Sequence, residues 1–216
     1  MAGTPWNDDD PADAALVTTN VLAIAQQIHA NSPARAPLTL KTLQEWHVRL
    51  FAGCVVPVSA YVGNFRGDPS VPELVDYEVQ VGGVPGVRAA VVEAQVQGLV
   101  DALNQALTRL DSQIPVGAVP DRAEIQTILL LCARVHGEWV RTHPFANGNG
   151  RTGRVIVAWL ALRYGLPVFL SIKPRPATND YAVAAQISMA PRSPGQDRDL
   201  PMAQVFLHML STLLGP

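Results

Sequence analysis

The stretch from His143 to Arg154 reads His-Pro-Phe-Ala-Asn-Gly-Asn-Gly-Arg-Thr-Gly-Arg, and it lies between two long apolar runs with helical spacing. Glycines let backbone N–H groups converge on an anion, and a helix that begins near Arg151 adds its positive N-terminal end. Arg151 and Arg154 share one helix face, so both guanidinium groups can reach phosphate oxygens. His143 lies just upstream as a candidate proton acceptor. The stretch therefore predicts a phosphate-binding turn with a base beside it.

The same stretch resembles the signature of the Fic (filamentation induced by cAMP) family, H-P-F-x-x-G-N-G-R-x-x-R. The matching residues are His143, Pro144, Phe145, Gly148, Asn149, Gly150, Arg151 and Arg154. Weaker likeness at 46–51, 61–66, 164–167 and 179–181 extends the resemblance over about residues 40–190. The resemblance implies an all-α fold, a Fic-fold helical bundle with a small β-hairpin flap. We expect residues 1–216 to form a single Fic domain with flanking N- and C-terminal helices.

The resemblance also implies roles for the motif residues. The family's matching histidine is the general base that takes the proton from a target hydroxyl, which makes His143, with Asn149 and Arg151, the catalytic candidates. By resemblance Asn149 contacts the α-phosphate region, Arg151 the β-phosphate and Arg154 the terminal phosphate. Phe145 would hold the loop from the core. The nucleotide-binding candidates are Phe145, Gly148, Asn149, Gly150, Arg151, Arg154 and Tyr181, although core packing is an equally good interpretation of Tyr181.

Asn147 departs from the family pattern. Most Fic enzymes have Asp or Glu here, and that carboxylate holds the Mg²⁺ that bridges the nucleotide phosphates. An amide offers one neutral oxygen to a hard cation and lacks the charge of a carboxylate. Asn147 is therefore a candidate metal ligand of reduced strength.

A hairpin is expected upstream of the motif, because Tyr77 to Val81 alternate, Gly82-Gly83 predicts a turn and Val84 can begin a return strand. The resemblance implies that this flap holds a segment of the target protein by strand addition, through Tyr77, Val79, Val81 and Val84. A simple surface excursion fits the residues equally well.

Helices are expected at 11–30, 39–51, 87–110, from 121 through 139, from about 151 to 164, at 177–190 and at 199–214. The run 155–164 is nearly all apolar, which predicts a buried helix whose N-terminus points at the phosphate site. The segment Pro191 to Gly195 is rich in helix breakers and should separate the last two helices. Cys54 and Cys132 are expected to be unrelated core thiols.

Composition limits the partners. A net charge of −2 and a pI near 6.2 argue against broad nucleic-acid or membrane binding, which needs clustered positive charge. The first residues are acidic where a signal peptide is basic, and no apolar run reaches spanning length. We therefore expect a bacterial protein of the cytoplasm, with export as an effector left open.

Restraint of the site is not visible in the sequence. Fic proteins are often restrained by a helix with Ser or Thr followed four residues later by Glu, and neither flank of the core has that spacing. Arg154 is therefore expected to lack an internal partner, so the enzyme would be open or would be inhibited by a separate small protein.

The expected activity is transfer of AMP, or another nucleoside monophosphate, from ATP with Mg²⁺ to a Ser, Thr or Tyr hydroxyl of a protein. Gly150 stands where a kinase-like branch of the family has Lys, which favours nucleotide transfer. Two alternatives are transfer of another phosphate-containing group and a weakened nucleotide-binding interaction module.

Overall fold

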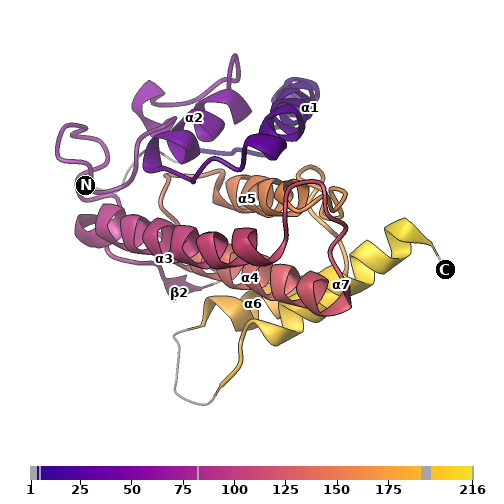
Figure 1. The fold of residues 1–216 in the computed structure, drawn as a ribbon. Coiled ribbons are helices and arrows are strands. Elements are labelled where there is room, and N and C mark those ends of the chain that lie inside the picture. The colour runs from indigo at the N-terminus through magenta and orange to yellow at the C-terminus, as the bar shows by residue number, and fades with distance from the viewer. Residues whose placement is uncertain (1–3, 5, 82, 191–195, 216) are drawn as a thin grey trace.

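The computed structural model describes the chain apart from residues 1–3, 5, 82, 191–195 and 216. The predicted all-α class is confirmed, since the described chain is a helical bundle with one small hairpin (Figure 1). The helices are α1 (Ala14–Asn31), α2 (Leu40–Leu50), α3 (Val92–Gln113), α4 (Arg122–Thr142), α5 (Asn149–Arg163), α6 (Asn179–Met189) and α7 (Leu200–Leu214). Short 3₁₀ turns lie at Pro11–Asp13, Ser32–Ala34, Ser59–Tyr61 and Ala89–Val91.

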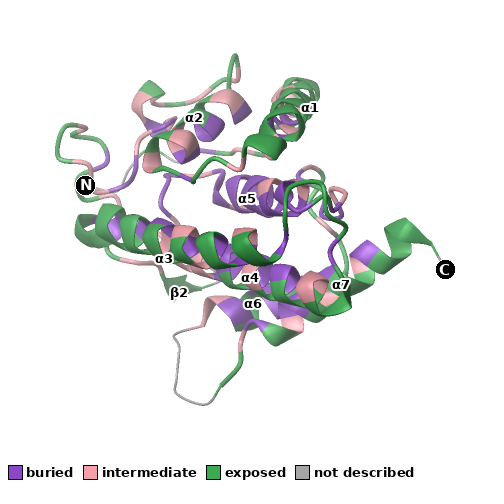
Figure 2. Cartoon of the chain, in the orientation of Figure 1, coloured by how far each residue is buried: buried purple, intermediate pink, exposed green. Residues whose placement is uncertain are grey.

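Helix α5 occupies the centre of the bundle. It packs against α1, α2 and α4, while α4 also contacts α3, α6 and α7. Most of α5 is buried, and its ribbon is largely purple in Figure 2. A helix that is apolar on every face can be stable only inside the protein. Because the motif directly precedes α5, the site is built on the most deeply buried helix of the molecule.

Capping residues explain where several helices begin. Asp121 and Glu124 form a capping box at α4, in which each side chain bonds the other residue's backbone N–H. Thr39 caps α2 and Thr178 caps α6 by a single bond each, in which the Thr side chain accepts the N–H of Thr42 or Tyr181. The predicted helix at 87–110 begins later, at Val92, because Ala89–Val91 form a 3₁₀ turn.

The hairpin is shorter than expected. Strands β1 (Gln80–Val81) and β2 (Val84–Pro85) are antiparallel, with Val81 opposite Val84. Tyr77 lies at the base of the hairpin, where its ring packs against Tyr61 at 5.2 Å between centroids, so the predicted strand 77–81 is too long. Gly82 of the predicted turn, and the predicted breaker segment 191–195, lie outside the described residues.

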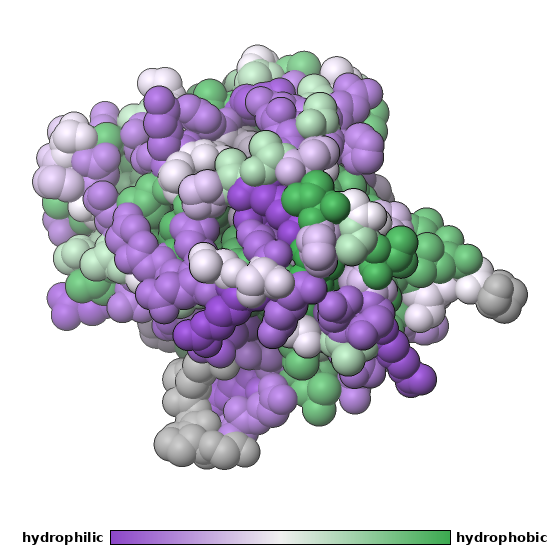
Figure 3. Space-filling view, in the orientation of Figure 1, coloured by the Kyte–Doolittle hydropathy of each residue, from purple (hydrophilic) through white to green (hydrophobic). Residues whose placement is uncertain are grey.

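The surface in view is largely hydrophilic, with apolar residues gathered towards the protruding end of α7 (Figure 3). Leu207, Leu213 and Leu214 of α7 are exposed. Within the described residues, no helix combines the length and the apolar character needed to cross a bilayer. Cys132 is a buried core thiol as expected, whereas Cys54 is only half-buried.

Candidate active site

A cleft of about 700 Å³ opens where the N-terminal end of α5 meets the C-terminal end of α4, helix α6 and the flap. It brings together six of the predicted residues, which are Val81, His143, Gly150, Arg151, Arg154 and Tyr181. Four charged residues that were not predicted also line it, namely Asp8, Asp9, Lys173 and Arg175. The cleft therefore combines two imidazoles, His143 and His136, with four cations and two carboxylates.

His143 ends α4 in a left-handed backbone conformation, with φ 50°, and its N–H donates to the Trp139 carbonyl at 2.9 Å. Its Nδ1 lies 3.3 Å from the Val140 carbonyl, which can only accept a hydrogen bond. Nδ1 therefore carries the proton, and Nε2 is the basic nitrogen. Burial lowers the pKa of His143 to about 4, and the Arg66 charge adds to the effect. The ring is neutral at neutral pH, as a proton acceptor must be.

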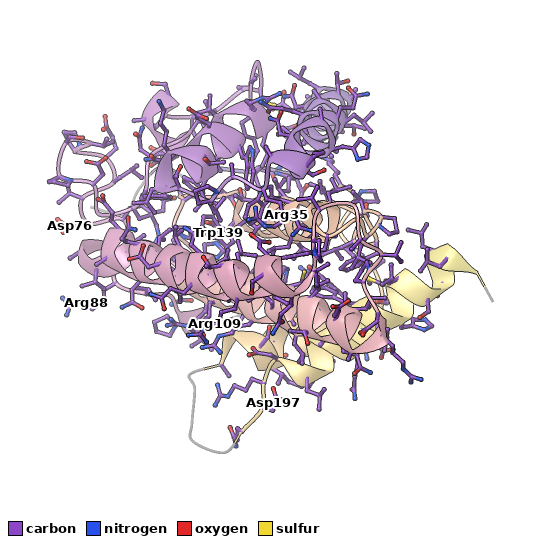
Figure 4. All side chains as sticks on the ribbon, viewed as in Figure 1. Arg35, Asp76, Arg88, Arg109, Trp139 and Asp197 are labelled. Carbon is purple, nitrogen blue, oxygen red and sulfur yellow. The ribbon has the colours of Figure 1, made fainter. Side chains whose placement is uncertain are left out.

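Two buried side chains, Phe145 and Asn149, hold the loop before α5 in place from the core side. Phe145 is fully buried, and its ring stacks on His47 with 3.8 Å between centroids. Both polar atoms of the Asn149 side chain bond the Phe145 backbone at 2.9 Å. Trp139, near the middle of the molecule in Figure 4, donates its Nε1–H to the Asn149 carbonyl. Asn149 thus points into the protein, so in this structure it shapes the loop and does not line the cleft.

His47 and Gly148 complete this support. His47 is fully buried, accepts the Gly63 N–H at Nδ1 and lies 3.0 Å from the Asn147 carbonyl through Nε2. Gly148 has φ 74°, and a Cβ here would lie 2.5 Å from the Phe51 ring. Only glycine meets both conditions. The supporting role of His47 was not predicted, and the only signal for it in the sequence is its position beside Trp46 in a segment that resembles the family.

Arg66 connects the loop to the flap. Its fully buried guanidinium donates to the carbonyls of His143, Tyr77, Val87 and Thr142 at 2.7–3.1 Å. Burial lowers the pKa of Arg66 to about 10, so the group stays charged at neutral pH. One side chain thereby fixes the carbonyls where the flap begins and ends, and also those of His143 and its neighbour Thr142.

The two motif arginines have different partners. Arg154 is buried and donates its Nε–H to the Ile172 carbonyl at 2.9 Å, so the expectation that it lacks an internal partner is wrong. Arg151 is also buried, and its Nη1 and Nη2 donate to Asp8, at 2.8 Å, and to Asp9. These two acids do not follow the Ser/Thr–Glu spacing of an inhibitory helix, because they lie outside any helix.

Tyr181 is buried, and its hydroxyl lies 3.0 Å from His136 Nε2. Its ring also faces the Arg175 guanidinium at 5.8 Å. Tyr181 therefore lines the cleft and also packs in the core, and its contact with a nucleotide stays a prediction.

The Asn147 amide is occupied by the protein itself. Its Oδ1 accepts the Gly148 N–H at 3.0 Å, and its Nδ2 donates to the Trp6 carbonyl at 2.6 Å. The described residues contain no group of three His, Cys, Asp or Glu side chains that could hold a metal ion. The arrangement around Asn147 does not fit a metal ligand.

The flap residues lie in different settings. Val81 and Val84 line a second cleft, of about 470 Å³, that the flap shares with Met189. The Val79 carbonyl accepts the Gly86 N–H inside the hairpin. The Tyr77 ring packs against Tyr61 at the start of the hairpin. Of the four predicted flap residues, Val81 and Val84 are therefore the two that face space a peptide could enter.

Comparison with known proteins agrees with this geometry. The Fic/DOC family model matches residues 37–161, more than half of the chain. No curated protein matches. A Fic-domain-containing signaling protein from Bacteroides thetaiotaomicron superposes with a TM-score of 0.62 at 19% identity, covering 90% of this chain and 69% of that one.

Two further structures are similar in fold. The N-terminal Fic domain of Bep8, a VirB-translocated effector from Bartonella sp. 1-1C, gives a TM-score of 0.58 at 15% identity, covering 96% of this chain and 91% of that one. Fic-1 from C. elegans gives 0.56 at 16% identity, covering 98% and 54%. The motif, the fold and the family model agree, and the chain belongs to the Fic/DOC family.

Proposed function

We propose that this protein is a nucleotidyltransferase that moves AMP from ATP to a Ser, Thr or Tyr hydroxyl of another protein. The observation that carries the proposal is the meeting of a neutral His143 with Arg151 and Arg154 in one cleft of a Fic/DOC chain. Phosphate transfer depends mostly on positioning and on charge stabilisation, which these residues can supply.

The proposed reaction begins with proton transfer from the target hydroxyl to Nε2 of His143. The hydroxyl oxygen forms a bond to the α-phosphorus, and the bond from that phosphorus to the bridging oxygen breaks. Pyrophosphate leaves with the electron pair of the broken bond. Arg151 and Arg154 are placed to stabilise the negative charge that develops on it.

The residues at the motif do not fit the expected Mg²⁺ ligand at Asn147. Both polar atoms of the Asn147 side chain are occupied by protein partners. Mg²⁺ prefers carboxylate and phosphate oxygens. In the proposed reaction Mg²⁺ would therefore enter with ATP, bound mainly by the nucleotide's phosphate oxygens.

The target would bind beside the flap. Val81 lines the nucleotide cleft, and Val84, which is exposed, lines the adjoining one. The short β1–β2 hairpin has an unpaired edge, so an extended peptide could add to it as a strand. This supports a protein segment as the docked partner, and the Ser, Thr or Tyr hydroxyl would come from that segment.

Labelling with radioactive ATP tests the reaction. We expect label from the α-phosphate, and none from the γ-phosphate, to appear on protein in a bacterial lysate or on the enzyme itself. His143→Ala should abolish labelling while nucleotide binding persists, because the imidazole handles a proton and holds no phosphate. Circular dichroism establishes that the variant is folded.

Other labelling patterns would favour the alternatives. Label from the γ-phosphate would indicate transfer of a different phosphate group. ATP binding without labelling under any condition would favour a nucleotide-binding interaction module, which the neutral Asn147 makes the second candidate.

A further inference from the structure

The residues Trp6, Asn7, Asp8 and Asp9, here called the acidic segment, lie across the cleft at Arg151. Asp8 and Asp9 occupy both terminal nitrogens of the Arg151 guanidinium. Lys173 lies 3.7 Å from Asp9 on the other side. The two carboxylates therefore hold Arg151, one of the two arginines to which the proposed function assigns phosphate oxygens, and Asp9 also pairs with Lys173.

The segment is anchored at a point away from the charges. Trp6 is buried and packs edge-on against Phe51, with 4.7 Å between ring centroids. Its carbonyl accepts the short hydrogen bond from Asn147 Nδ2. A carboxylate at position 147 could not donate this bond. The residue that departs from the family pattern thus fastens the segment to the motif loop.

Asp8 and Asp9 differ in how strongly they should compete with phosphate for Arg151. Burial raises the pKa of Asp8, while the Arg151 charge opposes that rise and the Asp9 charge adds to it. Asp8 is only one-fifth exposed, whereas Asp9 is three-quarters exposed and its ion pairs are screened by solvent. Asp8 should therefore contribute most of the competition.

We propose that the acidic segment is an internal competitor of the nucleotide's leaving phosphates, held in place by Trp6 and Asn147. This proposal rests on the proposed function only in assuming that Arg151 binds phosphate. A phosphate group and Asp8 cannot both bind the same guanidinium nitrogens, so docking of the segment and nucleotide binding exclude each other. The apparent affinity for nucleotide then falls in proportion to the fraction of released molecules.

The first test measures binding of inorganic pyrophosphate and of ATP by calorimetry. We expect Asp8→Asn to tighten both affinities about tenfold, Asp9→Asn to act more weakly, and the double variant to reach at least the effect of Asp8→Asn. Asn147→Ala, which removes the anchor and leaves both carboxylates, should tighten them in the same direction. Asn at position 8 keeps one oxygen for the buried Arg151.

Asp10→Asn is the matched control. It removes one negative charge from the residue that directly follows the acidic segment. The Asp10 carboxylate accepts the Ala12 N–H at 2.9 Å, and asparagine can cap the same turn. A change of less than about twofold is expected. If Asp10→Asn tightens binding as much as Asp8→Asn, the effect is net charge and the proposal fails.

The second test is hydrogen exchange at the amides of residues 6–9. Saturating pyrophosphate should accelerate exchange in the wild-type protein, because the segment leaves Arg151. Unchanged exchange with bound pyrophosphate, or no pyrophosphate binding even by the double variant, would overturn the proposal. Tighter binding without any α-phosphate labelling would keep the proposal and remove the transferase; labelling with unaltered affinities would do the reverse.

Discussion

At the scale of single residues, the environment of His143 makes a prediction about proton uptake. Burial lowers the pKa of its ring to about 4, so the neutral form should persist well below the ordinary value near 6.5. An NMR titration of the histidine ring protons should show His143 changing near pH 4. The exposed His29 serves as the reference in the same spectra. A midpoint for His143 near 6.5 would mean that solvent reaches the ring.

The sequence predicts which motif residues lie near the site, but it predicts less well the direction in which each side chain points. Arg151 and Arg154 reach one cleft because they share a helix face, and that follows from spacing. Asn149 lies between two glycines in the same motif, yet its amide turns inward to bond Phe145. The direction of a loop side chain depends on its tertiary partners, which spacing does not contain.

At the scale of elements, Asp111 of α3 joins three parts of the bundle. It accepts from Arg163 of α5 at 2.6 Å and from the Tyr164 hydroxyl at 2.9 Å, and it lies 3.4 Å from Arg35. Because Arg163 is buried, Asp111→Ala would leave its charge without a carboxylate. We expect the free energy of unfolding, measured in urea, to fall by about 3 kcal/mol.

The exposed Lys41–Glu45 pair on α2 is the control for that measurement. Glu45→Ala should lower the free energy of unfolding by no more than about 0.5 kcal/mol, because solvent screens an i,i+4 surface pair. Equal losses in the two variants would show that the Asp111 cluster contributes no more than an ordinary surface pair.

Helices and hairpin differed in how well they could be predicted. Apolar periodicity and caps such as Asp121 are local signals, so the helices lie close to their predicted positions. The hairpin is shorter than predicted because Arg66, which lies outside the alternating run, donates to the carbonyls of Tyr77 and Val87. These carbonyls are therefore not used for pairing between strands. A buried guanidinium that satisfies several carbonyls leaves no periodic pattern.

At the scale of the whole molecule, contacts distant in sequence account for what the sequence did not predict. Trp6 reaches Phe51 and Asn147, and Asp8 reaches Arg151. The acidic start of the chain was informative only as the opposite of a signal peptide. Its docking depends on the cavity that the folded bundle presents.

The fold as a whole should lose stability in mild acid, because three histidines are kept neutral by burial. Burial lowers the pKa of His47 and His136 to about 3, and that of His143 to about 4. Between pH 6.5 and 4 the unfolded chain binds protons at these positions and the folded chain does not, so the free energy of unfolding falls as pH falls. From pH 7 to 5.5 the loss should be about 3 kcal/mol, with the raised pKa of Asp8 offsetting a small part.

Urea unfolding at the two pH values measures this loss directly. His143→Gln should reduce it by about 1 kcal/mol, because one of the three titrating groups is gone. His208→Gln, at an exposed position of α7, should leave the loss unchanged. A wild-type free energy of unfolding that is the same at both pH values would show that these rings are protonated in the folded protein. A neutral His143 could then no longer serve as the proton acceptor.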